Sequence, residues 1–153
     1  MARLLTWTRS EHTLEEEHYL SVYTDGASRG NPGPAAIGFA IYDSVGNLIE
    51  KDAKFVGRRT NNEAEYEALI WGLERVRERS CSKIRAFSDS ELVVRQINGE
   101  YRISEERLKK YANTVRANKS LFESVKLSHV PRENPRTMLV DEMVNLALDR
   151  AGH

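Results

Sequence analysis

The sequence predicts an α/β protein, in which a mixed β-sheet packs against helices, from three observations. Apolar runs with the length of strands come first and are joined by short turns. Further short runs then alternate with long segments of helical periodicity. A chain of 153 residues, 40% of them hydrophobic, allows one sizeable core, so we expect a single domain over residues 19–153. This order predicts a sheet that begins antiparallel and becomes parallel.

The elements follow one another from Tyr19 onward. We expect strands near residues 19–25, 36–43, 48–56, 84–89 and 125–130. A hairpin turn at residues 45–47 joins the second strand to the third. We expect helices near residues 61–79, 90–98, 104–120 and 135–150. The last helix should begin at Pro135, because proline suits a first helical position and Asn134 can cap it.

The bulk composition is that of a protein of the cytoplasm. The formal net charge is zero, so binding to nucleic acid would need a local basic patch. The single cysteine, Cys81, excludes an internal disulfide framework and suits a reducing compartment. No apolar run is long enough to span a membrane or to form a signal peptide, and we expect no membrane association. Residues 1–18 mix charges without periodicity and are expected to form an extension that is partly disordered.

The most informative stretch is YTDGASRGNPGPAAIGFAIY, in which an apolar run ends at Asp25 and a glycine-rich turn follows. Three further acidic residues lie at similar ends of predicted elements: Glu65, Asp89 and Asp141. Mg²⁺ takes oxygen ligands and is usually shared between carboxylates and a substrate phosphate. Dispersed carboxylates that a fold can bring together therefore predict a metal-dependent nuclease.

Glu65 is expected to point inward from the first turn of its helix. It shares one helical face with a buried stripe of apolar residues and Gly72, whereas Glu63 and Glu67 fall on the opposite, solvent side. An inward carboxylate is costly unless something compensates it. A bound cation, a partner arginine or the helix dipole would each serve. Glu63 is explained by a capping box with Thr60.

Asp89 and Asp141 allow both a functional and a structural interpretation. Asp89 follows a predicted strand, and the carboxyl ends of strands are where α/β sheets place their sites. It also lies in a first helical turn, where an aspartate simply favours the dipole. Asp141 shares a helical face with Val144 and Leu148 and would serve equally as a half-buried fringe residue. Spacing alone does not decide whether the four carboxylates converge.

Taken together, these residues resemble ribonuclease H of type 1. The resemblance covers roughly residues 20–149 and rests on four segments: YTDGASRGNPGPAAIG, TNNEAEYEAL, SDSELVVRQING and, more loosely, HVPRENPRTMLVDEMVN. The resemblance implies the ribonuclease H-like fold, a five-stranded mixed sheet of strand order 3-2-1-4-5 with helices on both faces. That fold agrees with the order of elements predicted above.

The resemblance implies a catalytic site and a cofactor. Asp25, Glu65, Asp89 and Asp141 match the four metal-binding carboxylates of the family. It implies that two Mg²⁺ ions, or Mn²⁺ as a substitute, act on the scissile phosphate of the RNA strand in an RNA–DNA hybrid. The expected products carry a 3′-hydroxyl and a 5′-phosphate.

The resemblance also implies residues that bind the hybrid. Asn61 and Asn62 match asparagines that read the minor groove, and Gly26 and Ser28 fall where the backbone approaches RNA 2′-hydroxyls. Further positions match contacts to a DNA-strand phosphate: Asn31 and Thr60. Structural interpretations stay open for both, since Thr60 also fits a helix cap and Asn31 also fits a turn.

Three departures from the family pattern affect the last part of the chain. A histidine-rich loop is missing, which leaves His129, Arg132 or Glu133 as the residue that acts there, and Arg132 is expected to contact substrate. The join between Asn134 and Asp141 is longer than in short-loop relatives. The basic handle of some bacterial members is absent. Six basic residues between positions 101 and 119 either replace it weakly or form a solvated helix face: Arg102, Arg107, Lys109, Lys110, Arg116 and Lys119.

The sequence therefore predicts an endonuclease that hydrolyses RNA in RNA–DNA hybrids and removes primers and R-loops. We expect a monomer without an obligate protein partner. A hybrid-binding module that no longer cuts is one alternative, although all four carboxylates are present. A nucleotide-binding domain with GNPGPAAIG as a phosphate cradle is the other, but a second strand rather than a helix is expected to follow that segment.

Overall fold

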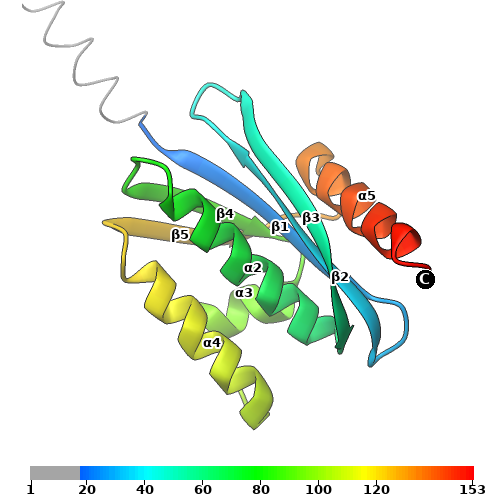
Figure 1. Ribbon diagram of the computed structural model, residues 1–153. Helices are drawn as coiled ribbons and strands as arrows, with labels where there is room; N and C mark the ends of the chain where they lie inside the picture. Colours follow the sequence, from blue (N-terminus) through cyan, green and yellow to red (C-terminus); the bar gives the residue numbers. More distant parts are fainter. Residues whose placement is uncertain (1–17) are drawn as a thin grey trace, which may run out of the picture.

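The computed structural model describes residues 18–153, and Figure 1 shows their arrangement. The predicted extension, residues 1–18, therefore lies outside the described residues except for His18. None of the helices in the described range is both long and apolar enough to cross a membrane. The elements after residue 18 follow the predicted order of three strands and then alternating helices and strands.

The five strands form one mixed sheet of order β3-β2-β1-β4-β5. The bounds are β1 Leu20–Ser28, β2 Gly33–Tyr42, β3 Leu48–Arg59, β4 Lys83–Ser88 and β5 Ser124–His129. Strand β2 pairs antiparallel with β1 and β3, whereas β4 pairs parallel with β1 and β5. The predicted fold class, strand order and change from antiparallel to parallel pairing are confirmed.

Helices cover both faces of the sheet (Figure 1). Their bounds are α2 Asn61–Arg77, α3 Glu91–Ile97, α4 Glu106–Lys119 and α5 Pro135–Arg150. Helix α2 packs on β1 and β2 and carries α4 beside it, and α5 packs on the opposite face across β1, β2 and β3. The predicted start of the last helix is confirmed, because α5 begins at Pro135 and Asn134 Oδ1 accepts the Arg136 N–H at 2.9 Å.

The two faces have separate cores because side chains alternate along each strand. Val22 and Phe39 pack with Leu69 of α2 in one core. Their chain neighbours Tyr23 and Ala40 belong to the other core, under α5. The face of each residue in β1 and β2 therefore follows from its position in this alternation.

Strand β1 is longer than predicted. We expected it to end at Asp25 in a glycine-rich turn, but it continues to Ser28. The reason is its pairing with β2, which extends to Ser28 opposite Ala35. A single sequence could not show that Gly26 takes part in a ladder, since glycine is depleted in strands. Asp25 therefore lies inside a strand.

Candidate active site

Asp25 and Asp89 are neighbours because of the parallel pairing between β1 and β4. The last pair in that ladder joins Thr24 to Ser88, so Asp25 is the next residue of β1 and Asp89 directly follows the end of β4. Beyond this pair β4 leaves the sheet and α3 begins at Glu91, while β1 keeps only β2 as a partner. Asp25 therefore lies beside the carboxyl end of β4, just past the last residue of β1 that pairs with it.

Glu65 comes to the same place from α2, and Gly26 makes the close approach of α2 to β1 possible. A Cβ atom at Gly26 would lie 2.1 Å from the backbone oxygen of Ala64 and 2.7 Å from the nitrogen of Glu65. Only glycine lets the first turns of α2 press this closely on β1. The Gly26 N–H donates a hydrogen bond to Glu65 Oε1 at 2.7 Å. The inward direction predicted for Glu65 is confirmed.

The predicted difference between Glu63, a solvent-facing capping residue, and inward-facing Glu65 is confirmed only in part. The capping box is present, with Thr60 Oγ1 accepting the Glu63 N–H at 3.2 Å and Glu63 Oε1 accepting the Thr60 N–H at 2.9 Å. The solvent-facing position expected for Glu63 is wrong, because its side chain is buried and lies 3.4 Å from Arg107 of α4. Glu67 is also half-buried, in an ion pair with Arg59 at 2.9 Å. Helix α4 covers the face of α2 that we assigned to solvent.

Asp141 reaches Asp25 from the other face of the sheet, where a second glycine brings α5 close. Gly38 pairs with Asp25 across β1 and β2. A Cβ atom at Gly38 would lie 3.0 Å from Val144 Cγ2 and 3.1 Å from Val140 Cγ1. The glycine thus lets α5 seat against the strand beside Asp25, and Asp141 follows Val140 directly. The negative charge of Asp141 raises the pKa of Asp25, and so does a hydrogen bond that the protonated Asp25 carboxyl donates to Asp141.

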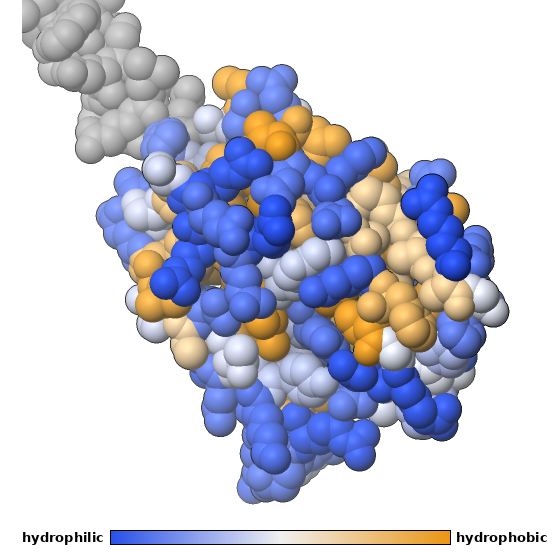
Figure 2. All heavy atoms as spheres, viewed as in Figure 1, coloured by the Kyte–Doolittle hydropathy of each residue, from blue (hydrophilic) through white to orange (hydrophobic). Residues whose placement is uncertain are grey.

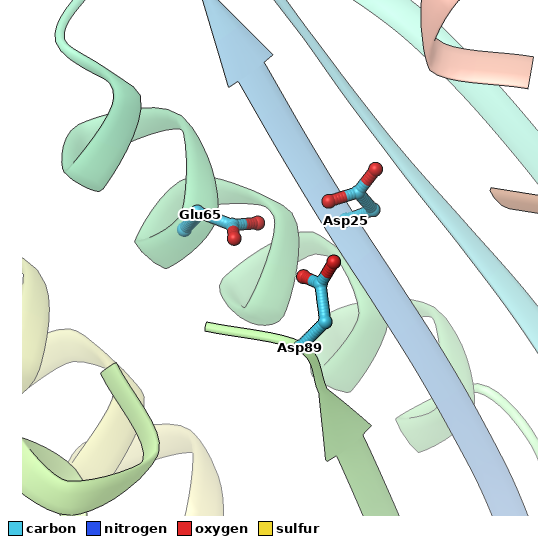
Figure 3. Close-up of side chains that lie close together, drawn as sticks. All are labelled: Asp25, Glu65 and Asp89. Atoms are coloured by element: carbon cyan, nitrogen blue, oxygen red, sulfur yellow. The ribbon is translucent and has the colours of Figure 1, made fainter. Parts of the chain in front are cut away.

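Asp25, Glu65 and Asp89 form a compact carboxylate cluster in which the three side chains point toward one another (Figure 3). One oxygen of each carboxylate lies within 4.8 Å of the others. Asp25 and Glu65 are 5% and 6% exposed, and among the ion pairs of the described residues none involves a member of this cluster. Like charges at this spacing in a buried site require protons or a cation.

The electrostatics of the cluster favour a bound cation. Burial raises the pKa of Asp25 to about 8, and the charges of Asp89 and Asp141 add to the rise. Burial also raises the pKa of Glu65 well above its ordinary value, with the charges of Asp25 and Asp89 contributing. A divalent ion with oxygen ligands suits this donor set, because it would compensate the charge that the protein leaves uncompensated.

Apart from Arg132, the residues predicted to bind substrate lie in β1, in the loop that follows it or at the N-terminus of α2. Asn31 Oδ1 accepts the Asn61 N–H at 3.0 Å, and Asn61 Oδ1 accepts the Ser28 N–H at 3.4 Å. Thr60 is the N-cap of α2, and half-buried Asn62 is the second residue of that helix. The helix cap predicted as a structural interpretation of Thr60 is confirmed, whereas the Asn31 side chain bonds to the start of α2 rather than within its own turn.

The last residue of β5, His129, lies unexpectedly close to the cluster. A ring nitrogen of His129 lies 3.2 Å from the backbone oxygen of Asp89, because His129 pairs with Ser88 in the parallel ladder between β4 and β5. Arg132 and Glu133 are exposed in the turn before α5. Sequence reasoning named His129 as one of three residues that could replace the loop histidine, but it missed this contact, whose signal would have been the register of β5 on β4.

Comparison with protein families gives one domain-length match. Residues 23–144 match the family described as "Reverse transcriptase-like". The chain is 40% identical over 132 residues to "Ribonuclease HI" of Halobacterium salinarum, and the match covers 84% of this chain and 64% of that protein. It is 34% identical over 131 residues to "Bifunctional protein Rv2228c" of Mycobacterium tuberculosis, covering 85% of this chain and 35% of that protein. The chain thus spans less than two thirds of the length of both relatives.

Solved structures show the same architecture. The crystal structure of RNase H1 from Halobacterium salinarum superposes with a TM-score of 0.83 at 36% identity, covering 86% of this chain and 98% of that one. LC11-RNase H1, solved in complex with an RNA/DNA hybrid, superposes with a TM-score of 0.82 at 38% identity, covering 88% and 99%. The family match over residues 23–144 includes all four carboxylates, Asp25, Glu65, Asp89 and Asp141.

Proposed function

Because this chain belongs to the type 1 ribonuclease H family, we propose that it hydrolyses the RNA strand of RNA–DNA hybrids as an endonuclease. The single observation that carries the proposal is the buried carboxylate cluster, which has no cationic partner among the described side chains. A structural relative supports the proposal further, because LC11-RNase H1, at 38% identity, was solved in complex with an RNA/DNA hybrid.

We propose that Asp25, Glu65 and Asp89 hold divalent metal and that Asp141 completes the site next to Asp25. Two Mg²⁺ ions, with Mn²⁺ as a substitute, would supply a water of lowered pKa and charge stabilisation at the leaving 3′-oxygen. The protein's own contribution is geometric. Gly26 and Gly38 admit the two helices, and the Gly26 N–H orients Glu65. The expected products carry 3′-hydroxyl and 5′-phosphate ends.

The hybrid is proposed to lie across the N-terminus of α2. Exposed Asn61 and half-buried Asn62 would offer amides to the minor groove, and RNA 2′-hydroxyls are proposed to approach the backbone near Gly26 and Ser28. Thr60 and Asn31 surround a helix N-terminus, whose free N–H groups and dipole favour a DNA-strand phosphate. Arg132, exposed in the turn before α5, is proposed to add a positive charge that contacts substrate.

A cleavage assay across nucleic acids and metals tests the proposal. End-labelled RNA–DNA hybrid, RNA duplex and DNA duplex are incubated with Mg²⁺, Mn²⁺ or EDTA, and product ends are identified by their need for phosphatase before ligation. We expect metal-dependent cleavage of the RNA strand of the hybrid, with Asp89→Asn as the inactive control. Hybrid binding without cleavage in any metal would instead indicate a binding module.

The cellular role follows from that activity. An enzyme of this specificity would remove RNA primers and resolve R-loops. We propose that it works in the cytoplasm as a monomer, without an obligate protein partner. Sedimentation of the metal-loaded protein with and without a short hybrid tests the oligomeric state.

A further inference from the structure

The loop between β1 and β2 grips α5 through one side chain, Arg29. Its Nη1 donates to Asp149 Oδ1 at 2.7 Å. Its Nη2 lies 3.3 Å from both the backbone oxygen and Oδ1 of Asn145. The guanidinium fork therefore holds α5 at two points that are one helical turn apart.

Those two points lie on the stripe of α5 that also carries a metal-site carboxylate. Asp141, Asn145 and Asp149 are four residues apart and share one helical face. The Asn145 Nδ2 group donates to the backbone oxygen of Asp141 at 3.0 Å. Arg29, Asn145 and Asp141 thus form a continuous chain of contacts from the loop to the cluster.

These polar contacts give α5 a directional restraint that its apolar packing does not supply. Val140, Val144 and Leu148 bury α5 on the sheet, but hydrophobic burial is not directional. A charged fork with several acceptors has a narrow preferred geometry and resists rotation of the helix about its axis. Rotation is the motion that would carry Asp141 away from Asp25.

We propose that Arg29 is a positioning residue that fixes the rotation of α5 and thereby the place of Asp141 beside Asp25. The inference rests on the proposed role of the carboxylates as a metal site. Asn31, two residues further along the same loop, accepts the Asn61 N–H at the start of α2. One short loop therefore braces both helices that deliver carboxylates to the cluster.

Mg²⁺ binding by the full chain tests this role without relying on cleavage. Titration calorimetry without substrate is compared with the Mg²⁺ dependence of hybrid cleavage. In Arg29→Ala we expect Mg²⁺ affinity to fall about tenfold, the range seen when residues that orient metal ligands are lost. The KM for hybrid at saturating Mg²⁺ should stay near the wild-type value. Arg29→Lys keeps a charge for Asp149 but lacks the forked guanidinium, so its Mg²⁺ affinity should lie between those of wild type and Arg29→Ala.

Arg95→Ala is the matched control. Arg95 also forms exposed ion pairs, with Glu91 and Glu100, but on the α3 side of the molecule. Its Mg²⁺ affinity should equal that of wild type. Wild-type Mg²⁺ affinity in Arg29→Ala would overturn the proposal, and so would a loss confined to hybrid affinity. If wild type binds Mg²⁺ but does not cleave hybrid, the proposed function fails while the effect of Arg29 on metal binding is still measured.

Discussion

At the scale of single residues, the site consists of carboxylates that the metal-free protein keeps under electrostatic strain. Asp25 combines 5% exposure with two acidic neighbours, Asp89 and Asp141, that raise its pKa further. Glu65 is compensated only by a backbone N–H, from Gly26. Such residues weaken a fold that would be more stable without them, which is typical of functional positions.

Asp25→Asn should therefore stabilise the metal-free protein in a pH-dependent way. The folded pKa of about 8 lies above the ordinary 3.8, so ionisation of Asp25 opposes folding increasingly as pH rises between those values. In EDTA at pH 7 we expect the variant to gain on the order of 1–3 kcal/mol in urea denaturation. The gain should shrink as pH falls and vanish below the ordinary 3.8, where Asp25 becomes protonated in both states. A gain that does not vary with pH would contradict the burial and repulsion assigned to Asp25.

The same variant should lose cleavage while it keeps its fold. Asp25→Asn and Asp89→Asn each remove a charge from the proposed metal site, and we expect less than about a tenth of the wild-type rate in Mg²⁺. Hybrid binding, measured by fluorescence anisotropy, should survive. Higher residual activity in either variant would remove that residue from the set of metal ligands.

Glu63 and Glu65 are two residues apart, and replacing each with glutamine should have opposite effects on cleavage. Glu65→Gln should abolish cleavage because it removes a carboxylate from the cluster. Glu63→Gln should remain active, since glutamine also fits a capping box. Its stability should fall by up to about 1 kcal/mol, because the contact with exposed Arg107 is weak. Activity lost in Glu63→Gln but retained in Glu65→Gln would show that the wrong glutamate has been assigned.

At the scale of elements, the helices and strands were predictable, whereas the contacts that position them were not. Periodicity identified α2 and the inward face of Glu65, because a stripe of apolar residues is a local signal. The extension of β1 to Ser28 depends on β2, and the burial of Glu63 depends on α4. Gly38 lay within a predicted strand without any local sign that α5 would seat on it.

Gly38→Ala should test whether the seating of α5 sets the site. The added methyl group would meet Val144 and Val140 at about 3 Å, so α5 must shift by a few tenths of an ångström. We expect a loss of about 1–2 kcal/mol in stability. Cleavage at saturating Mg²⁺ should fall about tenfold or more, because small displacements of reacting groups are costly.

Val144→Ala removes the nearest contact and provides the matched partner for Gly38→Ala. In the double variant α5 regains room, so activity should recover relative to Gly38→Ala alone. Double-mutant cycles report such coupling between neighbouring residues. Independent effects of the two substitutions would mean that Gly38 does not act through α5.

At the scale of the whole molecule, a neutral chain must concentrate positive charge where it meets nucleic acid. The face over α2, α3 and α4 is mostly hydrophilic, with apolar patches between the polar side chains (Figure 2). Helix α4 presents two basic sides on this face. Arg107 and Lys110 line a groove against α2 next to Glu63, whereas Arg102, Lys109 and Arg116 line a cavity of about 380 Å³ on the α3 side.

The two sides of α4 should differ in how they affect binding to hybrid. The α2 side adjoins the helix N-terminus that is proposed to hold a phosphate, so Lys110 should contribute to binding. Lys109 faces the other way and pairs with Glu106 at 2.9 Å.

The salt dependence of hybrid binding tests this difference. Each neutralised phosphate adds about 0.9 to the slope of log K against log salt on duplex DNA. Binding of a non-cleaved hybrid to Asp89→Asn, measured across salt concentrations, should give a shallow slope of a few contacts. Adding Lys110→Ala should lower that slope by up to about 0.9, and Lys109→Ala should leave it unchanged. A slope approaching that of about ten contacts would contradict the small basic footprint. Equal effects of the two lysines would show that the hybrid covers α4 from both sides.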